Sequence, residues 1–230
     1  MIINPSTNLK NFILPVWVAG SACAATKVLL GKSFHSEQIL ELPDSEGSIS
    51  VNVQSAALIE NGTKAVCTAF YESNLAVDIT RGLEIWTYVS LDKKQDKSDK
   101  CLEIVAGFGV GVYKKTDKIC LSEFSSEILY LNLAKLIPKD CRLRLEIVLP
   151  KGLELSKRTS NQAFGIVDGL ALIGTQAEAQ VSASPEQLKT SIQLICKKCS
   201  DSTFHGKLIF VIGENGLDLA IKSGLSSDLI

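Results

Sequence analysis

The sequence predicts an α+β fold, and three stretches of the chain support this prediction. Small residues fill a helical pattern over residues 17–30, and the residues that follow, up to 149, are mainly strand-like. Near the end of the sequence, an apolar run leads through glycines into a helical start. That order is typical of the first unit of a parallel α/β sheet.

Each predicted helix has a boundary signal. Residues 17–30 precede Gly31, and glycine commonly ends a helix. Residues 122–136 form a second helical pattern, which stops before Pro138 because proline disfavours helix at the residue in front of it. A third helix begins at Ser184, where Ser-Pro-Glu-Gln provides a capping serine and a proline in the first turn.

Alternation of apolar and polar residues predicts the strands. The alternation is clearest in two groups, Ile49, Val51 and Val53, and Leu143, Leu145, Ile147 and Leu149. Residues 65–69 and 83–89 are two further strand candidates. The charged run 92–100 indicates a solvated loop, and Leu-Pro-Lys-Gly at 149–152 indicates a tight turn.

A second domain begins late in the chain. Residues 207–212 are an apolar strand candidate, followed by Gly-Glu-Asn-Gly and a helical start over 217–221. A parallel sheet needs several such units, and the sequence contains one. We therefore predict an α+β domain over residues 1–203 and an incomplete α/β domain over residues 204–230.

The composition excludes several classes of protein. The 230 residues are 46% hydrophobic and 21% charged, as in ordinary soluble domains, and a chain of this length buries about 70% of its unfolded surface. The net charge of −1 and the lack of a large basic cluster argue against a nucleic-acid partner. No apolar run reaches the roughly 18 residues of a membrane span. Residues 12–25 are either the first helix or a secretory signal, and Gly20 favours the helix.

The cysteines and histidines indicate no metal site. Seven scattered cysteines, an odd number, favour a reduced, cytoplasmic protein. Cys196 and Cys199 form a C-x-x-C motif, but they share an apolar helical face with Ile192, so we expect them to pack in a core. His35 and His205 are too far apart in the sequence to suggest a metal cluster. No hydrolase triad or P-loop pattern is present.

Glycines mark the candidate site. Gly165, Gly169 and Gly174 interrupt an apolar run whose bends carry Thr159, Asn161 and Thr175. Another group, Gly107, Gly109 and Gly111, precedes a strand-like segment and not a helix, so the dinucleotide-binding interpretation fails. Both groups are either bends of the core or places where the backbone closely approaches a ligand. Asp78 and Thr80 either form a local turn or line a site.

Four segments carry the motifs of one family in the right order. They are GSACAATK at 20–27, AVDITRGLEI at 76–85, AGFGVGVYKK at 106–115, and NQAFGIVDGLALIGT at 161–175. The last three are similar to P-D-V-T-x-G-x-E-I, G-G-x-G-V-G-x-x-T-K and N-P-R-L-G-I-x-G-G-I-S-I-L-G-T-T. The chain thus resembles the cobalt-precorrin-5B C(1)-methyltransferases of oxygen-independent cobalamin (vitamin B12) biosynthesis. It departs from them at Ala163, where the family has arginine, and family members extend beyond its last residue.

The resemblance implies a fold and a reaction. The first domain would be like domain 2 of ribosomal protein S5, followed by a parallel-sheet domain. The enzyme would transfer a methyl group from S-adenosylmethionine to ring carbon 1 of cobalt-precorrin-5B, giving cobalt-precorrin-6A. Cobalt belongs to that substrate, so no protein-bound metal is expected, and a homodimer is left open.

The resemblance also implies site residues. One carboxylate, Asp78 or Glu84, would steady the sulfonium or accept a proton. Residues that would bind substrate or donor are Thr80, Gly82, Gly107, Gly109, Gly111, Lys115, Thr159, Asn161, Gly165, Gly169, Gly174, Thr175, Gly213 and Gly216. Two alternatives are a catalytically inactive, truncated protein that binds corrinoid or partner enzymes, and a small-molecule kinase-like protein with an S5-type fold.

Overall fold

The computed structural model describes residues 11–43, 47–75, 78–94, 100–179, 185–202, 204, 206–211 and 219–225. The chain divides into two compact units, Met1–Ala179 and Gln180–Ile230. The helices are α1 (Leu14–Leu29), α2 (Glu123–Leu133), α3 (Gly152–Ser156) and α4 (Pro185–Cys199), with short 3-10 turns η1 (Glu60–Gly62) and η2 (Asn161–Phe164). The strands are β1 (Glu37–Glu41), β2 (Ser48–Asn52), β3 (Ser55–Ile59), β4 (Lys64–Phe70), β5 (Glu84–Lys93), β6 (Leu102–Ala106), β7 (Gly109–Val110), β8 (Val112–Tyr113), β9 (Cys141–Val148), β10 (Ile166–Val167) and β11 (Gly169–Leu170).

A five-stranded sheet forms the centre of the first unit, with strand order β3-β4-β5-β9-β6. Its pairs are antiparallel except β6 and β9, which run parallel. The alternating residues of β9, Leu143, Leu145 and Ile147, are buried, as the sequence predicted. The chain therefore has the mixed α+β architecture expected of it.

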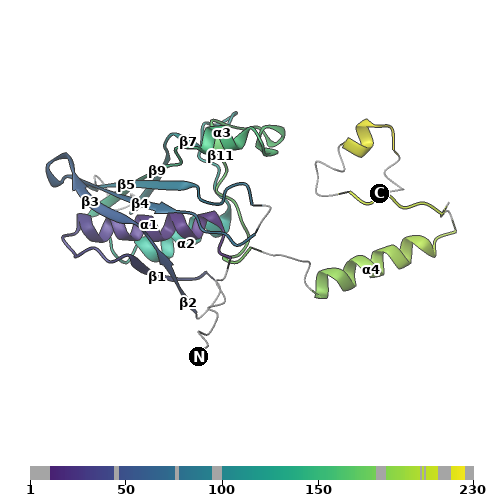
Figure 1. The fold of residues 1–230 in the computed structure, drawn as a ribbon, viewed down its shortest axis with the longest axis horizontal. Coiled ribbons are helices and arrows are strands. Elements are labelled where there is room, and N and C mark those ends of the chain that lie inside the picture. Colours follow the sequence, from purple (N-terminus) through teal and green to yellow (C-terminus); the bar gives the residue numbers. More distant parts are fainter. Residues whose placement is uncertain are drawn as a thin grey trace, which may run out of the picture. The chain divides into compact units, whose positions relative to one another are not determined.

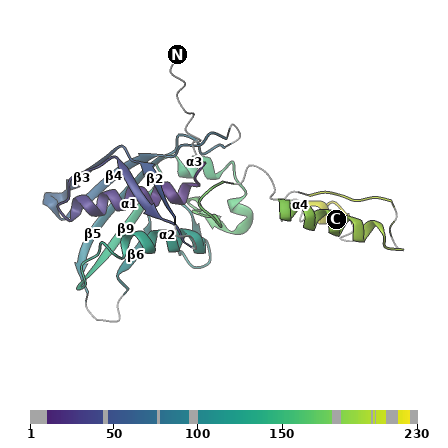
Figure 2. The same ribbon diagram turned by 90° about the horizontal axis from the view of Figure 1, so that it is seen from below.

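Helix α1 lies between two layers of strands. It packs on β4 and β5 on one side and against the β1–β2 ribbon on the other, with α2 beside it (Figures 1 and 2). Every residue from Pro15 to Thr26 is buried. Small residues make this possible: Gly20 lies so close to the side chain of Val51 that a Cβ atom would collide with it. The helix begins at Leu14, three residues before the predicted start, because Pro15 occupies the first turn, where proline is tolerated.

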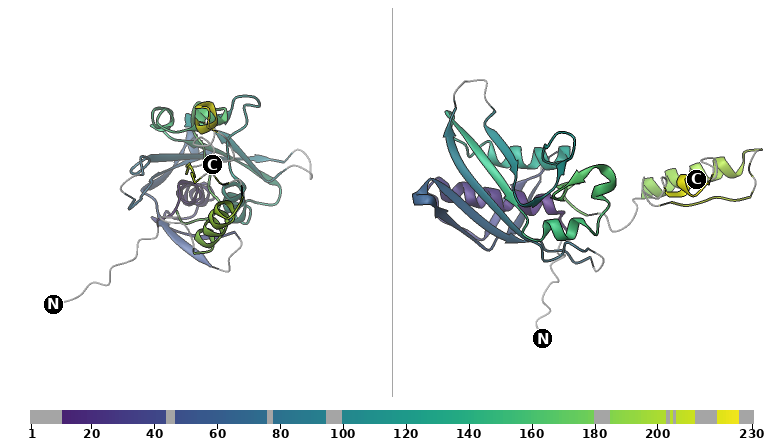
Figure 3. Two further views of the ribbon diagram at one scale, coloured as in Figure 1. Left: turned by 90° about the vertical axis from the view of Figure 1, so that its right-hand side faces the viewer. Right: turned by 90° about the horizontal axis from the view of Figure 1, so that it is seen from above.

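Helix α2 is shorter than predicted. Its start agrees with the prediction, since the Ser122 hydroxyl accepts the backbone N–H of Ser125. It ends at Leu133 and not at Leu136, and the next turn is tightened by a bond from the Leu136 N–H to the Leu133 carbonyl (2.8 Å). Both long helices of this unit cover the same face of the sheet. Figure 3 (right) looks at the sheet from the opposite side.

The second unit corrects two predictions. Helix α4 forms, but Cys196 and Cys199 are exposed and Ile192 is 57% exposed, so the predicted core packing of this face is wrong in the structure. Periodicity identifies an apolar face, whereas burial also needs a surface to cover it. Residues 207–211 form no strand, because a strand needs a pairing partner. Residues 219–222 are helical, within the predicted helical start, while Ser184, His205, Gly213 and Gly216 lie outside the described residues.

Candidate functional site

Three of the four motif segments meet at one end of the five-stranded sheet. Strand pairing fixes this end, because Phe70 lies opposite Glu84, and Ala106 lies opposite Ile147. The loops that follow β4, β6 and β9 therefore all leave the sheet at the same end of its strands. The fourth segment, residues 20–27, lies within α1 in the core.

Residues 107–121 and 149–174 build a small structure at this end, which we call the glycine substructure. In it, β7 pairs with β11 in parallel, β8 pairs with β10 antiparallel, and α3 packs on β7 and β11 (Figure 1). Gly109 stands at the centre with φ +79°, and its backbone carbonyl touches Gly152 and Gly169. A Cβ atom at either of these two residues would collide with that carbonyl oxygen.

The other motif glycines divide into two kinds. Gly107 and Gly111 also lie against the protein's own chain, since a Cβ atom at either would come within 2.7 Å of an atom of Ile147 or Ile166. Gly82 and Gly165 have positive φ angles of 76° and 71°, with open space where a Cβ would stand. Contacts inside the protein thus account for the glycines at positions 107 and 111. A ligand-binding role for any of these four glycines stays a prediction.

Polar residues of the same motif stabilise the glycine substructure. The Asn161 side-chain amide donates to the carbonyl oxygen of Gly169 (3.2 Å). The Thr159 hydroxyl donates to the carbonyl oxygen of Ser156 (2.7 Å), at the end of α3. The segment with Gly174 and the exposed Thr175 follows, and the Gly174 N–H donates to the Ser122 hydroxyl (3.2 Å).

The Gly174 segment also reaches the start of α1. A Cβ atom at Gly174 would collide with the Ile13 side chain, and the Ile13 N–H donates to the carbonyl oxygen of Ala177 (2.9 Å). The amino ends of α1 and α2 are therefore both next to this segment. Both helix dipoles place partial positive charge there, which favours anionic groups.

Asp78 organises the loop between β4 and β5. One of its carboxylate oxygens accepts the backbone N–H and the hydroxyl of Thr80 (2.9 and 2.6 Å), and the other accepts the Tyr71 hydroxyl (2.8 Å). Partial burial opposes ionisation, but the hydrogen bonds from Thr80 and Tyr71 outweigh it and hold the pKa of Asp78 below its ordinary value. The local turn is therefore present, and both oxygens of Asp78 are engaged in it.

This geometry predicts a pH-dependent contribution of Asp78 to stability. Because the folded-state pKa is depressed, the contribution is fully present above the unfolded pKa and is lost as the pH falls through the folded pKa. In urea unfolding, Asp78→Asn should be less stable than the native sequence near pH 7, and the difference should shrink as the pH falls below the ordinary pKa of an aspartate. The exposed neighbour Glu72→Gln is the control and should show no such difference. Equal stability of Asp78→Asn and the native chain near pH 7 would contradict the prediction.

Glu84 lies on the face of the sheet opposite α1. Its carboxylate accepts the indole N–H of Trp86 (2.8 Å), and Trp86 packs edge-on against Tyr88 (centroids 6.5 Å apart). A cavity of about 380 Å³ lies on this face, between these aromatic rings and Phe108 of the glycine substructure. Glu84 and Asp78 therefore belong to one end of the sheet but to different surroundings.

The glycine substructure carries an excess of positive charge. Its six cationic residues are all exposed: Lys114, Lys115, Lys118, Lys151, Lys157 and Arg158. Its acidic residues are three, Asp117, Glu154 and Asp168. The Lys114 N–H donates to the carbonyl oxygen of Gly165 (2.9 Å), next to the half-exposed ring of Phe164. The sequence did not predict the group as a whole, because its members come from two distant segments.

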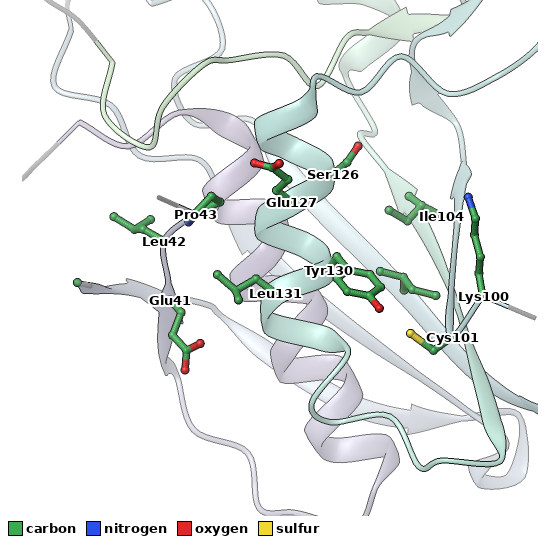
Figure 4. Close-up of a pocket in the computed structure, with 12 residues that line it drawn as sticks. Glu41, Leu42, Pro43, Lys100, Cys101, Ile104, Ser126, Glu127, Tyr130 and Leu131 are labelled. Atoms are coloured by element: carbon green, nitrogen blue, oxygen red, sulfur yellow. The ribbon is translucent and has the colours of Figure 1, made fainter. Parts of the chain in front are cut away.

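The sequence also gave no indication of a larger cavity, of about 970 Å³, beside α2. Figure 4 shows its walls: α2 contributes Ser126, Glu127, Tyr130 and Leu131, the end of β1 and its loop contribute Glu41, Leu42 and Pro43, and the start of β6 contributes Lys100, Cys101, Leu102 and Ile104. Its three walls are far apart in the sequence and none contains a motif. Such a site can be found only once the chain is folded.

Two searches of the described residues gave no further site. The described ranges contain no cluster of three or more His, Cys, Asp or Glu side chains that could hold a metal ion. The described helices all fall short of the length and apolar character that a membrane span requires.

Comparison with known proteins agrees with the motifs. Cobalt-precorrin-5B C(1)-methyltransferase of Prochlorococcus marinus strain NATL2A is 45% identical over 230 residues, covering 96% of this chain and 60% of the relative. The protein of the same name from strain MIT 9303 is 48% identical over 221 residues, covering 93% of this chain and 57% of the relative. The chain thus spans about three fifths of the length of these relatives.

A solved structure has the same fold. It is the cobalamin biosynthesis protein CbiD of Archaeoglobus fulgidus, with a TM-score of 0.56 and 17% identity, covering 93% of this chain and 66% of that one. The CbiD family model matches residues 7–181, which include all three motif segments at the end of the sheet. The chain therefore belongs to the CbiD family.

Proposed function

We propose that this chain takes part in the S-adenosylmethionine-dependent methylation of ring carbon 1 of cobalt-precorrin-5B, giving cobalt-precorrin-6A in oxygen-independent cobalamin biosynthesis. The names of its relatives support the reaction. The observation that carries the proposal is the meeting of three motif segments, residues 76–85, 106–115 and 161–175, at one end of the sheet.

The charge of the glycine substructure suits this substrate. The contracted tetrapyrrole carries acetate and propionate arms, so it is a polyanion. The exposed ammonium groups of Lys115 and Lys157 and the guanidinium of Arg158 can pair with carboxylates on several arms at once. The exposed Phe164 ring of the same substructure offers a flat apolar surface.

The reaction places modest chemical demands on the protein. The donor supplies an already activated methyl group, which leaves sulfur as a new carbon–carbon bond forms to the ring. The electron pair of the broken bond stays on the sulfur, so no covalent catalyst is needed. Holding both molecules in line can contribute about 7–11 kcal/mol. Glu84 is the better candidate to face developing charge, because Asp78 already uses both carboxylate oxygens in its turn.

The test is methyl transfer from labelled S-adenosylmethionine to cobalt-precorrin-5B, followed by mass spectrometry of the product. We expect Lys115→Ala/Lys157→Ala to raise KM for the tetrapyrrole about tenfold with kcat little changed, because exposed ion pairs hold the substrate and not the transition state. Added salt should weaken the binding of the tetrapyrrole to the native protein and reduce the difference in KM between the native protein and the double variant. Lys32→Ala, which removes an exposed lysine outside the site, is the control.

An unchanged KM in the double variant would show that the glycine substructure does not bind the tetrapyrrole. The absence of methyl transfer with bound tetrapyrrole would favour the alternative of a catalytically inactive corrinoid-binding protein. A normal rate for Glu84→Gln would exclude this carboxylate from the chemistry.

We further propose that residues 1–203 form a domain like domain 2 of ribosomal protein S5 and that residues 204–230 begin an α/β domain containing Gly213 and Gly216. The mixed five-stranded sheet, with both long helices on one face, supports the first part. A cytoplasmic location is supported by seven free cysteines, of which Cys23, Cys67 and Cys120 are buried. A homodimer would be detected by light scattering of the purified chain.

A further inference from the structure

The cavity of about 970 Å³ beside α2 has the size and the chemistry of a small-molecule site. Ligand cavities span about 300–1,000 Å³ and combine apolar walls with a few polar groups. Here Tyr130 of α2 points toward the β6 side of the cavity, where Ile104 and Cys101 lie, and Leu131 points toward Leu42 (Figure 4). Tyr130 is 57% exposed, so a ligand in this cavity would cover a large aromatic surface that the described residues leave open.

The charged residues of the cavity favour a cationic ligand. Its lining contains two carboxylates, Glu41 and Glu127, and one ammonium group, Lys100. Glu41 also pairs with Lys135 outside the cavity (2.7 Å). Among the described residues, Glu127 forms no ion pair, so its charge is available to a ligand. A tetrapyrrole with many carboxylates would find one cationic partner in this lining, Lys100, in contrast to the six of the glycine substructure.

The donor has the complementary chemistry. S-adenosylmethionine carries a net positive charge from its sulfonium and ammonium groups, a ribose diol that carboxylates bind well, and one carboxylate that Lys100 can pair with. Its adenine ring matches the apolar and aromatic walls.

The cavity also lies close to the motif segments. Ser126, in its lining, donates its hydroxyl to the carbonyl oxygen of Ser122 (3.1 Å), one helical turn earlier. The Ser122 hydroxyl accepts the N–H of Gly174, and the Ser122 N–H donates to the carbonyl oxygen of Leu172 (3.1 Å). A short chain of contacts along α2 therefore joins the cavity to the glycine substructure.

We propose that this cavity binds the methyl donor, with Tyr130 against the adenine ring and Glu127 toward the cationic sulfonium or the ribose diol. The inference rests on the proposed function and adds to it the place of the donor. None of the fourteen predicted site residues that the structure describes lines this cavity. Substrate and donor are then held by different charges, the cationic group of the glycine substructure for the polyanion and the Glu127 carboxylate for the cation.

Calorimetric titration of S-adenosylmethionine into the native chain and its variants tests the proposal. Glu127→Gln keeps the size of the side chain and removes its charge, and should raise Kd about tenfold. Tyr130→Ala should raise Kd by a similar factor. Glu123→Gln, an exposed carboxylate one turn earlier on α2 and outside the lining, should leave Kd within about twofold of the native value.

S-adenosylhomocysteine separates the two roles of Glu127, because it has the ribose diol but lacks the sulfonium charge. If Glu127 faces the sulfonium, Glu127→Gln should weaken the binding of S-adenosylmethionine more than the binding of this analogue. If Glu127 faces the ribose, the binding of both molecules should weaken by the same factor. Either result supports the cavity.

Cysteine alkylation gives a second readout that needs no activity. Cys101 lines the cavity, so bound donor should slow its reaction with iodoacetamide several-fold. Cys196 and Cys199 are exposed on α4 and serve as internal controls whose rates should not change.

Two results would overturn the proposal. One is saturable binding with an unprotected Cys101 and an unchanged Kd for Glu127→Gln, which would place the donor elsewhere and leave the proposed function intact. The other is no binding of the donor by the native chain. Binding in the cavity without methyl transfer to the tetrapyrrole would contradict the proposed function and not the donor site.

Discussion

Replacing Gly169 by alanine should destabilise the protein by about 3 kcal/mol or more, which is at the high end for adding one methyl group to a packed interior. The added Cβ would collide with the carbonyl carbon and oxygen of Gly109 and crowd the backbone nitrogen of Val110. Backbone atoms cannot move aside as a flexible side chain can. The β7–β11 pairing would therefore have to open. Urea unfolding followed by tryptophan fluorescence measures the loss.

Gly165→Ala is the matched control for this experiment. Gly165 belongs to the same motif and the same substructure, but open space surrounds the position of its Cβ. Its positive φ of 71° alone should cost about 1 kcal/mol. If Gly169→Ala and Gly165→Ala cost the same, close packing does not explain the glycine at position 169.

Asn132→Ala should cost about 3 kcal/mol, the second large effect expected. Asn132 is 1% exposed, and its amide nitrogen donates to the carbonyl oxygens of Glu41 (2.9 Å) and Ile128 (2.8 Å). Its oxygen accepts the N–H of Glu41 (2.8 Å). Alanine would leave both backbone groups of Glu41 without their partner, and each loss costs about 1–3 kcal/mol.

The effect of Asn132→Ala should extend beyond stability. Asn132 is the link that ties the end of β1 to α2, and Glu41 forms part of the cavity wall. The affinity for S-adenosylmethionine should fall together with stability. Asn161→Ala, which loses a single hydrogen bond to Gly169, is the control and should cost about 1 kcal/mol. If Asn132→Ala lowers the free energy of unfolding by less than Asn161→Ala does, the hydrogen bonds of Asn132 do not contribute as predicted.

Local patterns predicted the framework of the fold well. The alternation from Leu143 to Leu149 and the helical pattern that starts at residue 122 depend on neighbours in sequence, so they could be recognised directly. The predicted start of α1 is three residues late, because Pro15 is tolerated in the first turn and the helix begins at Leu14. The exposed face of α4 shows the limit of periodicity, which identifies an apolar face but not its partner.

The site was predictable only where it has motifs. Residues 161–175 and 106–115 marked the glycine substructure because their glycines are dense, and the structure explains this density by crossings of the chain. The cavity beside α2 had no such signal. Glu41, Cys101 and Tyr130 become neighbours through the packing of three elements, and long-range contacts of this kind leave no periodic trace in a single sequence.

The burial of α1 on both sides has a consequence for the newly made chain. This helix is synthesised early, whereas β9, which completes its sheet, ends more than a hundred residues later. At about 5–20 residues per second, the ribosome needs roughly 5–20 s to supply those residues. During that time β4 and β5 can cover α1, but the sheet lacks β9, which joins β6 to it. The nascent chain therefore exposes apolar surface of an incomplete sheet until β9 has emerged from the ribosome.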